Sequence, residues 1–322
     1  ALRSSVVAAL VAALVLTGCT PAPSTPDEDP AAAAIATMLD EVTQQEFTEH
    51  QFTSLVAQVM IDGQVISTVT LGEEMTGFPV TEDSRFRNGA VAIMYIGATM
   101  LAMADEGLID IDEPISRWLP DLPDADQATP RMLASMTAGY PDHVANADFL
   151  AAQAANPFRA WTEDELLAYS AASPRLFAPG ENWDYSHAGY MHLGNVLEAA
   201  SGKTLDELIT KYVLKPLKLD GTVADVTARI PAPAVHGFTA ERGLFEDSSY
   251  WNPSWTLPHG AIETTTIGDM TSSFDAIVGR GELLTPESHK AMISTDLVGF
   301  GAPLEGCRSC HTLTKEWTYG LG

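Results

Sequence analysis

Residues 90–107 read AVAIMYIGATMLAMADEG, and Tyr95 and Thr99 carry the only polar side chains before Asp105. A stretch of about four turns that is apolar on all sides predicts a helix buried in the middle of a globular core. Gly107 offers an end to this helix, because glycine readily adopts the left-handed conformation that closes many helices. We therefore expect the domain to fold around this segment.

The segments on either side predict a mixture of strands and helices. Residues 56–61 and 64–71 are expected to form two strands joined by a tight turn at Asp62 and Gly63. Further strand and turn signals occur around residues 235–246. Helices are expected at 32–42, 129–136, 162–171, 187–200, 204–213 and 266–278.

Ordered motifs around the apolar helix resemble those of one enzyme family. They read TGFPVTEDSRFRNG at 76–89, DEGLIDIDEPISRWLP at 105–120, FAPG at 177–180, WDYSHAGY at 183–190, WNPSW at 251–255, LLTPES at 283–288 and YGLG at 319–322. In this order they resemble the serine hydrolases of the class C beta-lactamase and D-Ala-D-Ala carboxypeptidase family. The resemblance runs from about Ser54 to the last residue, and chance does not place so many landmarks in one order.

The resemblance implies an α/β (multi-domain α+β) fold of the beta-lactamase/transpeptidase type for residues 35–322. In this fold a mainly antiparallel sheet is flanked by helices, and an all-helical lobe completes the domain. The ligand cleft of the family lies between these two halves. The resemblance also implies that the final strands and helix of the domain lie beyond Gly322.

The catalytic pair of the family is a serine at the start of the buried helix and a lysine three residues later. Positions i and i+3 share a helix face, so the amine can take the hydroxyl proton while backbone N–H groups stabilise an oxyanion. Here Ala90 stands where the serine belongs and Ile93 where the lysine belongs, and no lysine elsewhere follows a serine by three positions. A buried lysine without its partners would be a costly unpaired charge, so the joint loss is physically coherent.

The second motif of the family, Tyr-x-Asn, corresponds to Tyr185-Ser186-His187. The tyrosine is kept, and a histidine replaces the asparagine. His187 has the residue type of a general base, although a hydrogen-bonding role is the simpler prediction without a nucleophile. The third motif would lie beyond Gly322. His259-Gly260-Ala261 imitates it in letters but stands in the wrong place, so we expect a loop histidine there.

A catalytically defective member of the family is the first functional prediction. Its vestigial catalytic positions are Ala90, Ile93, Tyr185 and His187. Ligand contacts are expected from Tyr185 and His187, and from free N–H groups at Gly89 and Ala90, because a helix start attracts carboxylates. Peptidoglycan-type peptides or another cell-envelope ligand are the class that the resemblance implies.

An active hydrolase is the alternative prediction. It would belong to the carboxypeptidase, esterase or beta-lactamase class and use a non-standard nucleophile or an activated water. The candidate residues are Ser84, Ser186, Tyr185 and His187.

The charge of the chain excludes one class of partner. The 322 residues carry 43 acidic and 17 basic side chains, for a formal net charge of -26. A nucleic-acid binder needs clustered Lys and Arg to displace counterions from phosphate, so nucleic acid is excluded as a partner. The excess of acid is typical of a solvated surface kept soluble by self-repulsion.

The first 34 residues predict export. Residues 6–16 form an apolar run that is too short for the roughly 20 residues of a membrane span, and Leu16-Thr17-Gly18-Cys19 follows. This end resembles a bacterial lipoprotein signal, in which residues 1–18 are removed and the thiol of Cys19 is lipidated. Residues 19–34 are then a linker, and the protein is extracytoplasmic and anchored to the cell membrane. An ordinary secretory signal with an incidental cysteine is the alternative.

The two remaining cysteines form the pattern Cys307-Arg308-Ser309-Cys310. Outside the cytoplasm such a pair is expected to close a small disulfide loop. His311 completes the C-x-x-C-H pattern of haem attachment, but its polar surroundings favour the disulfide. Zinc would need four ligands, and no second cysteine pair exists, so neither metal nor cofactor is predicted.

Overall fold

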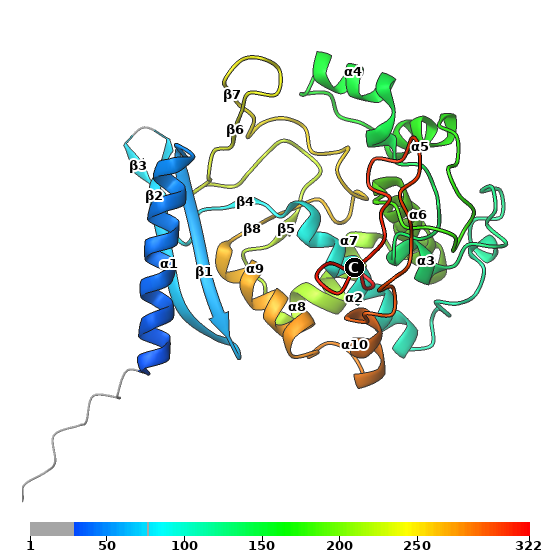
Figure 1. Ribbon diagram of the computed structural model, residues 1–322, viewed down its shortest axis with the longest axis horizontal. Coiled ribbons are helices and arrows are strands. Elements are labelled where there is room, and N and C mark those ends of the chain that lie inside the picture. The colour runs from blue at the N-terminus through cyan, green and yellow to red at the C-terminus, as the bar shows by residue number, and fades with distance from the viewer. Residues whose placement is uncertain (1–28, 76) are drawn as a thin grey trace, which may run out of the picture.

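The computed structural model describes residues 29–75 and 77–322, and places a small sheet beside a larger, mostly helical part (Figure 1). The sheet is antiparallel in the order β1–β2–β3. Helix α1 packs on β1 and β2, and α9 contacts β1 from the side of the larger part. The bounds are α1 Pro30–Glu49, β1 Ser54–Ile61, β2 Gln64–Met75, β3 Phe78–Pro79 and α9 Ile267–Phe274.

The predicted hairpin is confirmed by β1 and β2. Asp62 and Gly63 connect the strands with φ angles of 50° and 76°. Two positive φ angles give the backbone twist that matches two twisted antiparallel strands, and Asp-Gly meets this requirement at low conformational cost. The prediction of a helix at residues 32–42 is also confirmed, although α1 begins earlier, at Pro30. Residues 30–34, predicted as the end of a linker, are therefore helical.

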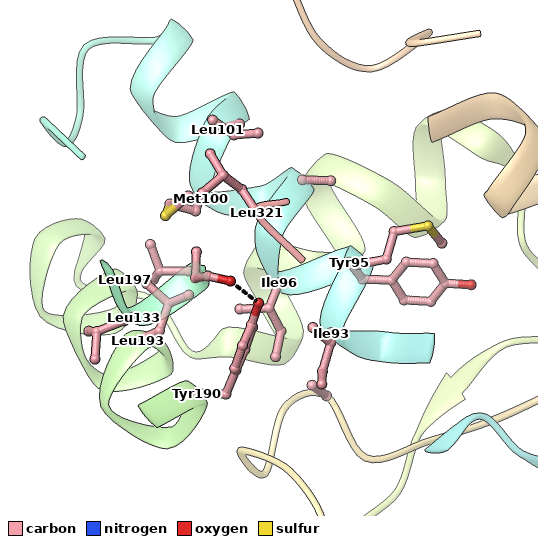
Figure 2. Close-up of a cluster of buried hydrophobic side chains, with 14 of the residues drawn as sticks. Ile93, Tyr95, Ile96, Met100, Leu101, Leu133, Tyr190, Leu193, Leu197 and Leu321 are labelled. Carbon is pink, nitrogen blue, oxygen red and sulfur yellow. Dashed lines mark hydrogen bonds between the residues drawn. The ribbon is translucent and has the colours of Figure 1, made fainter. Parts of the chain in front are cut away.

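The buried helix is confirmed as α2 (Ala92–Asp105), which follows a 3-10 turn at Gly89–Val91. Every residue from Ala92 to Met103 is buried, as an entirely apolar helix requires. Figure 2 shows Ile93, Ile96 and Met100 of α2 among side chains of the surrounding helices. The helix ends before Gly107, whose φ is 71°.

The last residues of the chain pack directly against α2. A Cβ added to Gly97 would lie 2.0 Å from the carbonyl oxygen of Leu321, so only glycine permits this approach. Leu321 is buried and lies near Met100 in Figure 2. The helix is thus enclosed by segments from distant parts of the sequence.

Among the described residues, the helical part contains the predicted helices together with three that the sequence did not predict. The helices expected at 129–136, 162–171, 187–200, 204–213 and 266–278 are confirmed within a few residues, and the last two change to π-helical turns near their ends. Helices α4, α8 and α10 were not predicted, and α8 continues directly from the π-helical turn at Thr210–Leu214. The bounds are α3 Pro130–Ala134, α4 Ala147–Ala155, α5 Glu163–Ala172, α6 His187–Ser201, α7 Leu205–Ile209, α8 Lys215–Leu217 and α10 Pro286–Met292.

A second antiparallel sheet, in the order β4–β8–β5, leads into α2. Strands β4 (Phe86–Arg87) and β5 (Val223–Ala224) flank β8 (Glu263–Thr265). The strand signals around 235–246 correspond to the short pair β6 (Phe238–Thr239) and β7 (Glu246–Asp247). The pairing of β4 with β8 holds the chain just before the start of α2.

A buried polar pair joins β8 to the residue before the 3-10 turn. Asn88 donates from Nδ2 to Oε2 of Glu263 at 2.8 Å, and the two residues are 3% and 2% exposed. Burial raises the pKa of Glu263 to about 8, because a charged carboxylate would lose its hydration there. Glu263 is therefore mainly a neutral acid at pH 7.

The predicted signal peptide, Cys19 and residues 19–28 of the predicted linker lie outside the described residues. Within residues 29–75 and 77–322, none of the helices combines the length and apolar character needed to cross a bilayer.

Candidate ligand site

The start of α2 carries apolar side chains at both positions where the family resemblance leads us to expect catalytic groups. Ala90 is exposed within the 3-10 turn, and Ile93 is 4% exposed in the core. An alanine methyl cannot attack a carbonyl carbon, and an isoleucine cannot accept a proton. These two positions therefore carry neither a nucleophile nor a base.

A cavity of about 430 Å³ lies at the start of α6. Its walls come from four stretches within 139–145, 173–177, 184–187 and 306–309. Tyr185 and His187, two of the predicted ligand contacts, line it; Gly89 and Ala90, the other two, are not among its lining residues. The structure thus brings together only half of the predicted set.

His187 is oriented by a carboxylate that sequence reasoning missed. Ser186 caps α6 by accepting a hydrogen bond from the backbone N–H of Gly189 at 2.9 Å, which fixes His187 as the first helical residue. Nδ1 of His187 then lies 2.9 Å from Oδ2 of Asp142. Because a carboxylate only accepts, Nδ1–H is the donor, and Nε2 is the ring atom left for another partner.

Asp142 is largely buried, and its partners stabilise the ionised carboxylate. Burial alone would raise its pKa, but the hydrogen bonds from His187 and from the backbone N–H of Val144, together with the electrostatic attraction of the two neighbouring histidines, outweigh it. The pKa of Asp142 therefore lies below its usual value, and the residue is ionised at neutral pH. The pair resembles the carboxylate and imidazole of an acid–base dyad.

His143 packs next to Asp142, on the side away from the cavity lining. Its Nε2 donates to the carbonyl oxygen of Trp255 at 2.9 Å, and its Nδ1 lies 3.6 Å from Oδ1 of Asp142. Burial lowers the pKa of His143 despite the neighbouring carboxylate. It is a neutral packing residue, and His187 is the histidine that lines the cavity.

Two further titratable groups lie on the same wall. Burial raises the pKa of Tyr185 to about 12, and the charge of Asp142 adds to this effect, so the phenol keeps its proton at neutral pH. Burial also raises the pKa of Asp184, with Asp142 again contributing, despite hydrogen bonds from Ser309 and Tyr185. Arg308 lies on the wall as an exposed cation. Apolar contacts come from Pro141, Val144, Leu176 and Phe177.

The predicted disulfide is confirmed in the fourth wall of the cavity. Cys307 and Cys310 are bonded, with Cα atoms 5.6 Å apart. Together with Asp184 they form a cluster whose ligand atoms lie within 4.8 Å of one another. The disulfide leaves no thiolate for a metal, and the same bond occupies both sulfurs that haem attachment would require.

The other candidate nucleophiles have structural roles. Ser84 is fully buried and hydrogen-bonded to Glu74 and Thr81. Ser186 is the helix cap of α6, and its hydroxyl also donates to the carbonyl oxygen of Tyr140 at 2.9 Å. Neither hydroxyl has a free approach to a substrate.

His259-Gly260-Ala261, which resembles the third motif in letters only, also lies away from the cavity. The backbone N–H of His259 donates to Glu163 at 2.6 Å, and His259 lines a separate small hollow. This placement agrees with a loop histidine.

Comparison with known proteins gives the family. The family model described as Beta-lactamase matches residues 33–314. The chain belongs to the beta-lactamase family. Among curated relatives, esterase EstB of Burkholderia gladioli is 27% identical over 310 residues, which cover 85% of this chain and 78% of EstB. Penicillin-binding protein 4* of Bacillus subtilis is 24% identical over 54% of this chain and 38% of its own length.

Solved structures of other proteins share the fold of this chain. A D-stereospecific amidohydrolase from Streptomyces sp. matches with a TM-score of 0.72 and 25% identity, covering 91% of this chain and 82% of the other. The D-amino acid amidase of Ochrobactrum anthropi SV3 matches with a TM-score of 0.68 and 24% identity, over 81% and 73%. The beta-lactamase/transpeptidase-like fold, with its helices and antiparallel sheets, is therefore confirmed.

Proposed function

We propose that this protein binds a peptide- or amide-bearing ligand in the cavity beside His187 and does not perform Ser–Lys acyl transfer. The observation that carries the proposal is the pair Ala90 and Ile93 at the start of α2. Ser–Lys chemistry needs an oxygen nucleophile and a base there, and a methyl and a buried branched alkyl group supply neither.

The cavity has the groups that such a ligand needs. Nε2 of His187 and the phenol of Tyr185 offer hydrogen bonds, Arg308 offers a positive charge for a carboxylate, and Leu176 and Phe177 offer apolar surface. A concave site with an apolar lining and a few placed polar groups is typical of small-molecule binding. Relatives named esterase, penicillin-binding protein, carboxypeptidase and amidase support an ester-, amide- or peptide-like ligand.

A labelling assay tests the absence of Ser–Lys chemistry. Purified protein is incubated with fluorescent penicillin, and hydrolysis of nitrocefin and p-nitrophenyl butyrate is followed. We expect no covalent label and no hydrolysis above the buffer rate. A stoichiometric penicillin adduct that survives denaturation would overturn the proposal.

A binding assay tests the cavity. Titration calorimetry with the dipeptide D-Ala-D-Ala and with D-phenylalanine amide is compared between the native protein and His187→Ala. Loss of one hydrogen bond in a partly buried site weakens binding by about tenfold. The matched control is His236→Ala, because His236 also pairs with an aspartate, Asp247, at 2.7 Å but lies outside the cavity. Equal affinity in both variants, or no binding of either probe to the native protein, contradicts the proposed site.

A second candidate function is hydrolysis by a water that His187 activates. The 2.9 Å contact between His187 and Asp142 favours it, because the pair leaves Nε2 as an acceptor toward the cavity. In that case ester hydrolysis would be measurable in the native protein, unaffected by substitution of Ala90, and abolished in His187→Ala. Activity that persists in His187→Ala excludes this mechanism.

We also propose that residues 1–18 are a lipoprotein signal and that Cys19 carries the lipid. The apolar run and the Leu16-Thr17-Gly18-Cys19 end support this. In a bacterial host, the native protein is expected in the membrane fraction with a lipid-modified N-terminal peptide. Cys19→Ala should move the protein to the soluble fraction; an unmodified Cys19 in membrane-bound protein argues against the anchor.

A further inference from the structure

The Cys307–Cys310 loop combines features that a purely structural disulfide does not need. One sulfur faces a cavity, a backbone N–H points at that sulfur, and a carboxyl group lies beside both. We propose that this disulfide is a thiol–disulfide exchange site, reduced by a dithiol partner through attack on Cys307, and that its reduction releases one wall of the cavity. This inference is independent of the ligand proposed above.

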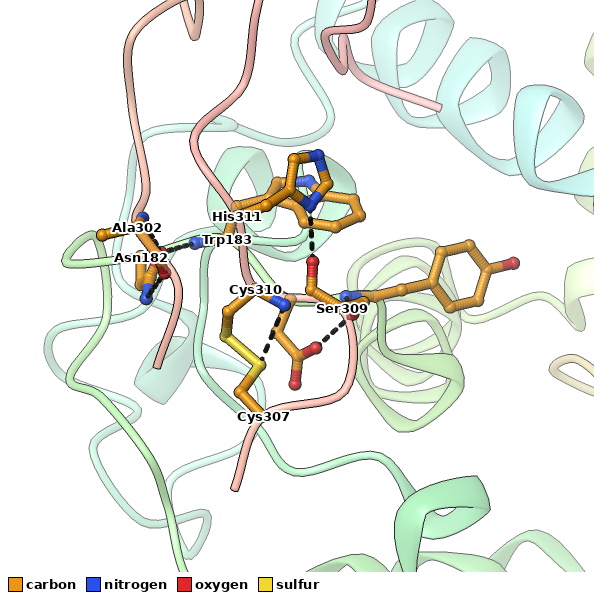
Figure 3. Close-up of a disulfide and its surroundings, with 9 residues drawn as sticks. Asn182, Trp183, Ala302, Cys307, Ser309, Cys310 and His311 are labelled. Carbon is orange, nitrogen blue, oxygen red and sulfur yellow. Dashed lines mark hydrogen bonds between the residues drawn. A yellow bond between two sulfur atoms is a disulfide. The ribbon is translucent and has the colours of Figure 1, made fainter. Parts of the chain in front are cut away.

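The two sulfurs differ in access. Cys307 is partly exposed and lines the cavity of about 430 Å³, whereas Cys310 is 9% exposed and is not among the lining residues. Figure 3 shows the bond between them, with Ser309 and His311 beside it. Exchange depends on access to the attacked sulfur, so Cys307 is the sulfur that an incoming thiolate reaches.

The loop can stabilise a thiolate on Cys307. The backbone N–H of Cys310 donates to Sγ of Cys307 at 3.1 Å, as drawn in Figure 3. A hydrogen bond to a charged acceptor is stronger than one to a neutral acceptor, so this N–H favours the thiolate over the bonded sulfur. Cys-x-x-Cys motifs are among the surroundings in which thiolates are favoured.

Asp184 can supply the proton for the other sulfur. One of its carboxyl oxygens lies within 4.8 Å of both Sγ atoms. Burial raises the pKa of Asp184, with the charge of Asp142 adding to the effect, so the carboxyl group is more readily protonated than an exposed aspartate. A proton donor is needed here because Cys310 leaves as a thiolate into a buried position.

The exchange balances with one dithiol as reductant. A thiolate of the dithiol attacks Sγ of Cys307, a mixed disulfide forms, and the bond to Cys310 breaks with the electron pair moving to Sγ of Cys310, which takes a proton relayed from solvent by Asp184. The second thiol of the dithiol, once deprotonated, attacks its own partner sulfur and releases Cys307 as a thiolate. The protein gains two electrons, and the dithiol becomes a disulfide.

The loop is joined to the cavity wall through Ser309. Its hydroxyl accepts from the backbone N–H of Tyr185 at 2.9 Å and donates to Asp184. Tyr185 in turn lies against His187, with ring centroids 5.1 Å apart. Freeing the loop removes these contacts, so the redox state of the cysteines bears on the residues that line the cavity.

Two variants that each keep one cysteine of the Cys307–Cys310 pair test which sulfur is attacked. Cys310→Ser and Cys307→Ser proteins, each checked for folding by circular dichroism, are incubated with oxidised glutathione, and adducts are quantified by peptide mass mapping. We expect Cys307 to form the adduct about tenfold faster than Cys310, because of its access and its N–H donor. Equal rates, or no adduct on folded Cys307, overturn the proposal.

Two measurements on the full chain test the remaining steps. Asp184→Asn is expected to slow reduction by dithiothreitol at pH 7, whereas Glu305→Gln, which removes an exposed charge from the same loop, is not. If Asp184→Asn is reduced as fast as the native protein, the proton-donor role is wrong. Hydrogen exchange at the amide of Tyr185 should become faster after reduction; unchanged exchange overturns the coupling to the cavity.

Discussion

Helices α2 and α6 begin in different chemical surroundings, although both begin at motifs that the family uses for catalysis. The start of α2 has no side-chain cap, and Ile93 enters a core of apolar side chains. The start of α6 has Ser186 as its cap and holds His187 against Asp142. An apolar side chain needs no hydrogen-bond partner, so Ile93 packs as part of the core. A buried polar group needs partners, so the start of α6 is a hydrogen-bonded network.

The largest change in stability is expected when a charged side chain is placed in α2. Ile93→Lys places an ammonium group among apolar side chains, and the free energy of unfolding should fall by about 3 to 5 kcal/mol. Urea denaturation measures the loss. Ile93→Leu is the matched control and should lose less than about 1.5 kcal/mol. A stable Ile93→Lys protein would mean that partners for the lysine are still present at this helix start.

The next largest change in stability concerns Glu263, which is hydrogen-bonded to Asn88 just before the 3-10 turn that precedes α2. Its pKa is about 8 in the folded protein against 4.5 as the ordinary value. Between these values the folded protein holds a proton that the unfolded chain has released, so the free energy of unfolding falls as the pH rises, by up to about 1.4 kcal/mol per pH unit. Glu263→Gln should flatten this slope in urea titrations between pH 5 and 8, while the exposed Glu82→Gln should leave it unchanged.

Asp142 gives the opposite pH dependence at the start of α6. Its pKa is lowered from 3.8, so the unfolded chain binds a proton first as the pH falls below this value, and acid favours unfolding. Asp142→Asn should remove this acid-side loss. At pH 7 it should lower the free energy of unfolding by about 1 to 2 kcal/mol, because a charged acceptor becomes neutral. A variant with the same acid profile as the native protein would contradict the ionised state of Asp142.

The smallest effect is expected at Ala90. This residue is exposed, so Ala90→Ser should change the free energy of unfolding by no more than about 0.5 kcal/mol. No ester hydrolysis should appear, because Ile93 cannot take the hydroxyl proton. Calorimetric unfolding and a p-nitrophenyl butyrate assay measure both quantities. Activity gained by this single change would show that another base reaches the start of α2.

The sequence predicted features that depend on neighbouring residues. The buried helix followed from an apolar run, the hairpin from Asp62-Gly63, and the disulfide from two cysteines three positions apart. Helix α4 was missed because alanines and a single buried Phe149 leave little periodic signal. Helix α10 was missed because its short span buries only Met292.

By itself the sequence determined the family, the buried helix and the absence of serine and lysine from its start, since each of these is written in consecutive residues. Only the tertiary structure decided which groups meet at the cavity. Asp142 reaches His187 across 45 positions, and Ser309 reaches Tyr185 across 124. Hydrogen-bond partners this far apart depend on where the chain returns in space, and no local pattern encodes that return.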